Sequence, residues 1–221
     1  MVPEYIPPST QRVLEPIERI SEVLFGLIMV LTFTCSFSVA EAGRAGVRTM
    51  LLGALGCNLV WGIIDAIMYL MGCLAERARS LATFHAVRKA ADPEKAHRLI
   101  SSALPPTVAP VVGAATLEDI RLHLMLLPEP PTHPRLTSKD WVGAVGVFVL
   151  VVLSTCPVVL PFAFMRNVMR AQRVSNAIAI GMLFLTGYSF GRCTGYHPRV
   201  MGLAMVALGS LLVGLAIVLG G

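Results

Sequence analysis

The sequence predicts an all-α integral membrane protein with five transmembrane helices and a small helical extramembrane segment between the second and third. Two observations lead to this class. Charged residues make up only 14% of the chain and hydrophobic residues 55%, whereas about a quarter of a typical soluble domain is charged. Several apolar runs also reach the roughly 20 residues that a helix needs to cross the hydrocarbon core of a bilayer.

The first 22 residues precede the apolar part of the chain. They contain no apolar core of signal-peptide type, so we expect the first span to stay in the mature protein. Apolar residues recur there at helical spacing, at Val13, Ile17, Ile20 and Leu24. This pattern predicts either an interfacial amphipathic helix over residues 1–22 or a simple helical extension of the first span.

Five apolar stretches have the composition of transmembrane helices. They cover residues 23–40, 50–74, 141–164, 175–191 and 199–219. Trp141 opens the third, as is typical of a residue at the membrane interface. Pro157 and Pro161 lie four residues apart in the same span, which predicts a kink or backbone carbonyls freed to line a cavity.

These spans divide the chain into four regions. They are the N-terminal helix (1–22), transmembrane helices 1 and 2 (23–74), the extramembrane segment (75–140) and transmembrane helices 3 to 5 (141–221). In the extramembrane segment we expect a helix that continues the second span. A second helix follows, capped by Asp92 with Pro93 at its first position, and a third opens with a capping box at Thr116 and Asp119.

Five spans place the two termini on opposite sides of the membrane. The side of the N-terminus and residues 75–140 carries the larger number of lysines and arginines, although a count over short loops alone reverses the balance. We expect a cytoplasmic N-terminus and a multi-pass protein of the bacterial inner membrane. We attribute the net charge of +5 to membrane topology and to contacts with lipid headgroups, and we expect no nucleic-acid partner.

The second span contains one carboxylate, Asp65, near its middle. An aspartate there costs about 2.5–3.5 kcal/mol on insertion scales, so a partner or a function must offset that cost. Asp65 shares a helical face with other polar, sulfur-containing and small residues. This face contains Asn58, Trp61, Gly62, Asp65, Met68, Tyr69 and Gly72. We expect it to lie against another helix or a wet cavity.

The first span offers a possible partner face. It carries Glu22, Gly26, Met29, Phe33 and Ser36, with Thr32 beside them. Oxygen and thioether ligands together suit Fe²⁺ or Mn²⁺. The candidate metal ligands are Asp65, Asn58, Met29, Met68 and Glu22. Asp65 is also the candidate proton carrier, because a carboxyl group shielded from water can exchange a proton for a cation. In the alternative interpretation, Asp65 only fixes helix packing.

Glycines repeat on the last two spans. Gly187, Gly191 and Gly195 recur every four residues, and the small residues Gly202, Gly209 and Ala216 recur every seven. Such repeats allow close packing in a tight bundle or at a dimer interface. We expect the repeat of the fourth span to pack inside one subunit. The first and second spans are then expected to meet their symmetry mates at a two-fold axis, where Gly26 and Gly62 permit close approach and two copies of Asp65 and Met29 share a metal.

The sequence gives no positive sign of an enzyme. It contains no GxSxG, HExxH, Walker A or GxGxxG motif, and its five cysteines form no CxxC or metal-ligand spacing. We therefore expect neither catalytic residues, a disulfide framework nor a permanently bound cofactor, with a metal present only as the transported substrate.

The order of these segments resembles the vacuolar iron transporter family, which includes bacterial members. The likeness covers the first span in SEVLFGLIMVLTF, the second in GALGCNLVWGIIDA and the polar insertion after it. It continues through the proline pair of CPVVLPF, the fourth span in GYSFGRCTG and the glycine-rich last span. The resemblance implies a homodimer that exchanges Fe²⁺ or Mn²⁺ for protons along a path between the first spans of the two subunits.

The chain departs from that family at its membrane carboxylates. Met29 stands where the family has an aspartate, Asn58 where it has a glutamate, and Asp65 where it has a serine. The insertion, residues 75–140, is also poor in acidic residues. We therefore do not expect it to have the metal-binding role that the insertion has in that family. The leading hypothesis is a proton-coupled exporter of divalent metal in which Asp65 is the principal carboxylate. The alternative is a non-transporting membrane scaffold that binds a partner or organises lipid.

Overall fold

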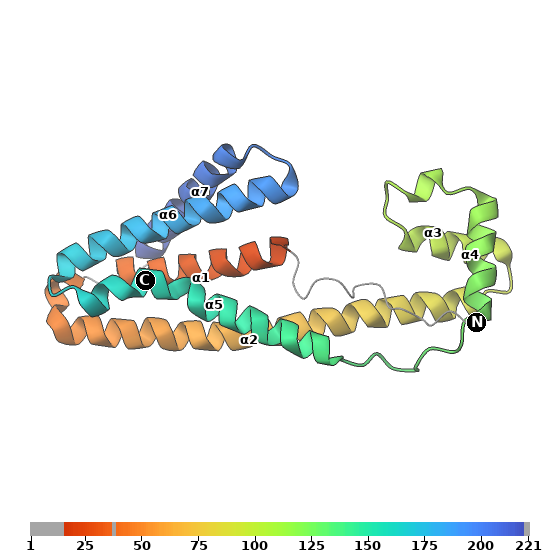
Figure 1. The fold of residues 1–221 in the computed structure, drawn as a ribbon, viewed down its shortest axis with the longest axis horizontal. Coiled ribbons are helices and arrows are strands. Elements are labelled where there is room, and N and C mark those ends of the chain that lie inside the picture. The colour runs from red at the N-terminus through yellow and green to blue at the C-terminus, as the bar shows by residue number, and fades with distance from the viewer. Residues whose placement is uncertain (1–15, 37–38, 219–221) are drawn as a thin grey trace. The chain divides into compact units, whose positions relative to one another are not determined.

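The computed structural model describes residues 16–36 and 39–218, which are helical apart from short connections (Figure 1). The helices are α1 (Pro16–Ser36), α2 (Val39–Lys89), α3 (Pro93–Ala103), α4 (Ala114–Leu126), α5 (Ser138–Phe164), α6 (Val168–Thr194) and α7 (Pro198–Val218), with a 3₁₀ turn, η1, at Ala109–Val111. The all-α class is confirmed. Most of the predicted N-terminal helix lies outside the described residues.

Four described helices are long and apolar enough to cross a membrane. The qualifying stretches are Gly46–Lys89, Ser138–Phe164, Val168–Thr194 and Pro198–Leu215. The chain is therefore a multi-pass membrane protein. The predicted first span, residues 23–40, runs partly outside the described residues, and its described apolar stretch is Glu22–Leu31.

The chain forms two compact units. Among the described residues, one contains Leu70–Asp140, and the other contains residues 16–36, 39–69 and 141–218. Helix α2 belongs to both, because it continues without a break for 51 residues. No proline interrupts it between Val39 and Lys89, which confirms that a helix continues beyond the second predicted span.

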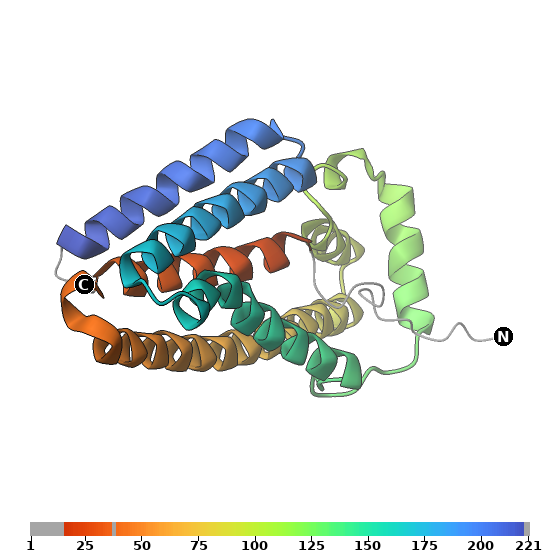
Figure 2. The same cartoon turned by 60° about the vertical axis from the view of Figure 1, so that its left-hand side comes forward.

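In the larger unit, α1 packs against α6 and α7, and α6 packs against α7 (Figures 1 and 2). A buried apolar cluster joins α1, α5, α6 and α7. Its members are Leu27, Val30, Leu31, Val158, Val159, Ala179, Leu183 and Val213. Helix α5 continues through Pro157 and Pro161. The Ser175 hydroxyl of α6 donates to the Val158 carbonyl (2.6 Å), which adds a polar contact between α5 and α6.

Glycines allow α6 and α7 to approach closely. A Cβ atom at Gly187 or Gly191 would meet Met201 of α7, and one at Gly202 would meet Phe184 of α6. These two repeats therefore pack inside one chain, as predicted for the fourth span. Gly195 is different, because it ends α6 in the left-handed region at φ 77°. Its assignment to the packing face was wrong.

The predicted fourth span, residues 175–191, was too short. Helix α6 begins at Val168 because the Asn167 side chain caps it, accepting a hydrogen bond from the Arg170 amide (3.1 Å). It then continues to Thr194. The first two turns contain Arg170 and Arg173, so the helix begins with a charged stretch ahead of its apolar run.

In the smaller unit, α3 and α4 pack through an apolar cluster of Val87, Ala96, Ile100 and Leu117. The predicted cap of α3 is confirmed, since the Asp92 carboxylate accepts a hydrogen bond from the Glu94 amide (3.0 Å) and Pro93 follows it. The capping box predicted for α4 was wrong. This helix begins at Ala114, two residues before Thr116, because the two alanines that follow Gly113 are strong helix formers.

A charged pair links the two ends of the smaller unit. The Arg77 guanidinium of α2 donates to both carboxylate oxygens of Asp140, at 2.6 and 2.8 Å. It also donates to the Arg135 carbonyl (2.8 Å), while the Thr137 amide donates to Asp140 (2.5 Å). Asp140 is buried. This fork-shaped pairing fixes the point at which the chain enters α5.

A second charged group joins α3 to α4. The Glu118 carboxylate accepts from Arg121 at 2.6 and 2.9 Å and pairs with His97 Nε2 at 2.8 Å. Hydrogen bonds from Arg121 and then His97 lower the pKa of Glu118 to about 2. A lowered carboxyl pKa stabilises the folded state above the unfolded value and loses this effect as the pH falls.

We therefore expect acid to loosen the contact between α3 and α4. Between about pH 4.5 and pH 2, the amides of α3 and α4 should lose protection as Glu118 takes up a proton, when exchange is measured relative to the intrinsic rate at each pH. Glu118→Gln should exchange faster at pH 6 and lose most of this acid-dependent change. An identical acid dependence in wild type and variant would contradict the role of this carboxylate.

Candidate functional site

Asn58 of α2 is a polar residue buried within the membrane spans, only 1% exposed. Its Nδ2 donates to Thr155 Oγ1 of α5 (2.7 Å) and to the carbonyls of Val151 and Val152 (3.4 Å each). Thr155 Oγ1 itself donates to the Val152 carbonyl (3.0 Å), which fixes Asn58 Nδ2 as the donor. Asn58 Oδ1 is therefore a buried acceptor without a hydrogen-bond partner in the described residues.

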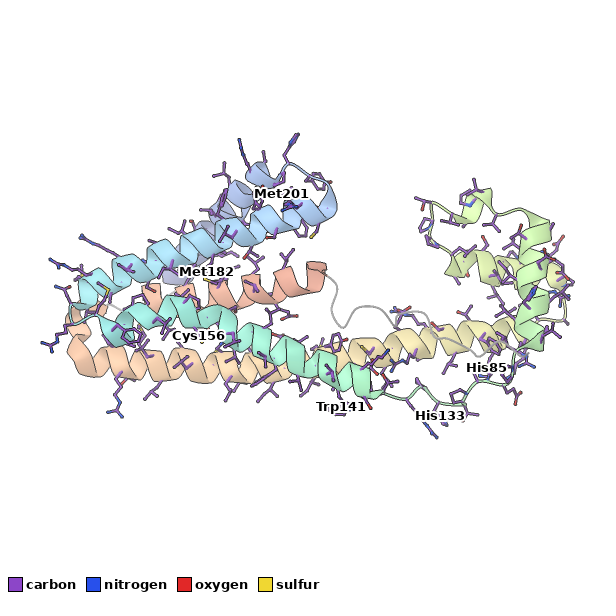
Figure 3. All side chains as sticks on the ribbon, in the orientation of Figure 1. His85, His133, Trp141, Cys156, Met182 and Met201 are labelled. Atoms are coloured by element: carbon purple, nitrogen blue, oxygen red, sulfur yellow. The ribbon has the colours of Figure 1, made fainter. Side chains whose placement is uncertain are left out.

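Helix α1 reaches the same turn of α5. A Cβ atom at Gly26 would lie 2.6 Å from Ser154 Oγ and 3.4 Å from the Thr155 methyl carbon. Helices α1 and α2 thus both meet α5 around Asn58, Ser154 and Thr155, which we call the polar seam. Cys156 marks this part of α5 in Figure 3. Ser154 and Thr155 were missed from the sequence, although two hydroxyl residues just before a proline in an apolar span were a usable signal.

Glu22 lies one helical turn before Gly26 on α1 and is half-buried. Residues four apart share a helix face, so Glu22 lies on the side of α1 that approaches α5. Asp65 lies two turns beyond Asn58 on α2 and is also half-buried. Asp65 makes no hydrogen bond or ion pair with the described part of the chain.

The predicted polar face of α2 divides into two strips. Asn58 and Gly62 are buried, and a Cβ atom at Gly62 would lie 3.1 Å from the Phe148 ring of α5. In contrast, Trp61 is 47% exposed and Met68 60% exposed. Asp65 lies between the two strips, so its carboxylate borders both the interior of the bundle and the outer surface of α2.

The predicted methionine ligands have different surroundings. Met29 packs against the apolar cluster of α1, α5, α6 and α7, whereas Met68 is exposed on α2. The described residues contain no group of three or more His, Cys, Asp or Glu side chains able to hold a metal ion. Within one chain, the described site therefore consists of Asp65 and the polar seam, with Glu22 nearby on α1.

No known protein-family model matches the chain, and no characterised protein is significantly similar to it.

Two glycines have a different role from the predicted one. Gly26 and Gly62 were expected to bring two subunits together, but each contacts α5 of its own chain. Helical periodicity identified these positions as close-packing positions without identifying the neighbouring helix. Gly26→Leu would therefore disturb the fold of one subunit, and its effect could not be assigned to a dimer interface.

The hydrogen bond between α2 and α5 can be tested directly. Thr155→Val keeps the side-chain shape but removes the 2.7 Å partner of Asn58 Nδ2. We expect it to lower the free energy of unfolding in detergent by about 1 kcal/mol. The control is Thr194→Val, which removes only a bond to the carbonyl of Phe190 in its own helix. Equal melting temperatures for the two variants would contradict the contribution of this cross-helix bond.

Proposed function

We propose that this multi-pass membrane protein transports a divalent transition metal, Fe²⁺ or Mn²⁺, in exchange for protons and as a homodimer. In this proposal residues 23–40 form the first of five spans, and the protein exports the metal from the cytoplasm across a bacterial inner membrane, with a cytoplasmic N-terminus. The observation that supports it is the half-buried Asp65, a membrane carboxylate without a hydrogen-bond or ion-pair partner in the described residues.

A carboxylate in this position needs a positive counterpart. A proton or a metal ion at Asp65 offsets the cost of about 2.5–3.5 kcal/mol that an unpaired charge carries near the centre of a span. The two ions compete for the same oxygens, so binding of one releases the other. This competition is the chemical basis of proton-coupled transport, and it requires no further titratable group in the spans.

One chain supplies few ligands at this level of the bundle. Asp65 offers two oxygens, and Asn58 Oδ1 is a further acceptor two turns away. A second copy of the chain doubles this set. Met68 lies on α2 one turn beyond Asp65 and is exposed. It is therefore better placed than Met29 of α1 to contact a second subunit. We therefore revise the shared site to two Asp65 carboxylates with Met68 thioethers beside them, a mixture of ligands that suits Fe²⁺ or Mn²⁺.

Thermal unfolding of the detergent-solubilised protein tests metal binding. A metal that binds only the folded state at 100 times its dissociation constant adds about 2.7 kcal/mol, which corresponds to roughly 5–10 °C for a chain of this size. We expect Mn²⁺ and anaerobic Fe²⁺ to raise the melting temperature of wild type, Mg²⁺ to have little effect, and Asp65→Asn to remove the metal response.

The second candidate is a non-transporting membrane scaffold. The use of Asn58 Nδ2 in a contact between α2 and α5 favours it, because a polar group in a span can serve packing alone. In that case neither Fe²⁺, Mn²⁺, Co²⁺ nor Zn²⁺ shifts the melting temperature, and Asp65→Asn changes stability without changing any flux. A metal series without a response would therefore reject the transporter proposal.

A further inference from the structure

A cavity of about 390 Å³ lies between the first part of α2, the end of α5 and the start of α6. Its lining includes the apolar side chains of Val47, Leu51, Phe162 and Ala171 together with Arg48 and Arg166. Val47, Phe162 and Ala171 belong to a buried cluster with Met50. The apolar wall is therefore a packed part of the fold.

The arginines of this cavity are not neutralised by the described residues. Arg48 and Arg166 are exposed and make neither an ion pair nor a hydrogen bond with the described part of the chain. Arg170 and Arg173 follow on the first turns of α6 and are also exposed. Guanidinium groups bind phosphate oxygens through paired hydrogen bonds, so this arrangement favours an anionic phosphate group.

The cavity also lies at a defined level of the membrane spans. Helix α5 ends at Phe164 and α6 begins at Val168, so the cavity is at the end of two helices that can cross the bilayer. Lipid phosphates occupy this level, and acyl chains extend from it along apolar helix surfaces. A soluble anion would use the arginines but gain nothing from the apolar wall.

We propose that this cavity binds an anionic phospholipid, with its phosphate between Arg48 and Arg166 and part of an acyl chain against Val47, Leu51 and Phe162. The site is independent of the proposed metal transport. A basic surface attracts membranes in general, but this site also places apolar side chains beside two arginines that have no partner in the described residues.

Native mass spectrometry of the full chain in detergent tests this site. The delipidated protein is mixed with phosphatidylglycerol, with phosphatidylcholine of the same acyl chains, or with inorganic phosphate. We expect one tightly held phosphatidylglycerol and about tenfold weaker retention of it after Arg48→Gln with Arg166→Gln. The matched control, Arg192→Gln with Arg199→Gln, removes two exposed arginines away from the cavity lining and should retain the lipid as wild type does.

A second variant tests the apolar wall without changing charge. Ala163 lines the cavity and is exposed, so Ala163→Trp can fill its opening without replacing a buried residue. This variant should also lose phosphatidylglycerol. Equal retention of phosphatidylcholine, unchanged binding in the Arg48 and Arg166 variant, or an equal loss in the control would overturn the proposal. Displacement of the lipid by inorganic phosphate at millimolar concentration would assign the site to a free anion instead.

Discussion

Asp65→Asn is expected to reduce Mn²⁺ uptake into proteoliposomes to the level of protein-free vesicles. The substitution keeps the side-chain size but removes the charge that attracts the metal and the site that exchanges a proton. It should leave the fold intact, because Asp65 makes no hydrogen bond or ion pair with the described residues. Stability should stay equal or rise, since an unpaired membrane carboxylate is costly.

The control for this experiment is Asp119→Asn, which makes the same chemical change at an exposed position of α4. It should keep full Mn²⁺ uptake and an unchanged proton flux. Both variants alter net charge equally, so a difference between them reports the position of the carboxylate. Wild-type uptake by Asp65→Asn would exclude Asp65 as ligand and proton carrier, whereas loss of uptake together with a collapsed melting curve would indicate a packing role.

Helix positions followed from the sequence wherever the determining interaction is local. Asp92 caps α3 because its carboxylate reaches an amide only two residues away. The continuation of α2 beyond residue 74 followed from a run without proline, but its start at Val39, ahead of the predicted span 50–74, was not predicted. Errors occurred where two local signals competed. Thr116 and Asp119 formed an acceptable capping pattern, yet the alanines before them extend α4 to Ala114.

The candidate site was harder to predict because its geometry depends on contacts between helices. Periodicity placed Asn58, Asp65 and Met68 near one face of α2, but it could not show that α5 covers Asn58 and leaves Met68 exposed. Likewise, Met29 has the right spacing for a ligand and yet packs in an apolar cluster. The partner Thr155 is 97 residues from Asn58, beyond the reach of any local pattern.

The close approach of α6 and α7 leads to a second prediction with a large expected effect on stability. Gly187→Ala should lower the free energy of unfolding by about 1–3 kcal/mol, because an added carbon overpacks this interface. A Cβ atom there would lie 2.5 Å from the Met201 carbonyl oxygen, a backbone atom that cannot rotate away, and 2.6 Å from Met205 Cγ. Figure 3 shows Met201 on α7 where that helix runs beside α6.

Gly181→Ala provides a control on the same helix. Gly181 also lies inside α6, but a Cβ atom there has no neighbour within 4 Å. Both substitutions replace glycine by a better helix former, a gain of up to about 1 kcal/mol in water. Gly181→Ala should therefore leave the melting temperature unchanged or raise it, while Gly187→Ala lowers it by several degrees. If the two variants melted together, contact with α7 could not be the reason for glycine at position 187. A fall limited to Gly187→Ala would show that α6 and α7 are held together by backbone proximity, the form of packing that lets two apolar helices associate inside a lipid bilayer.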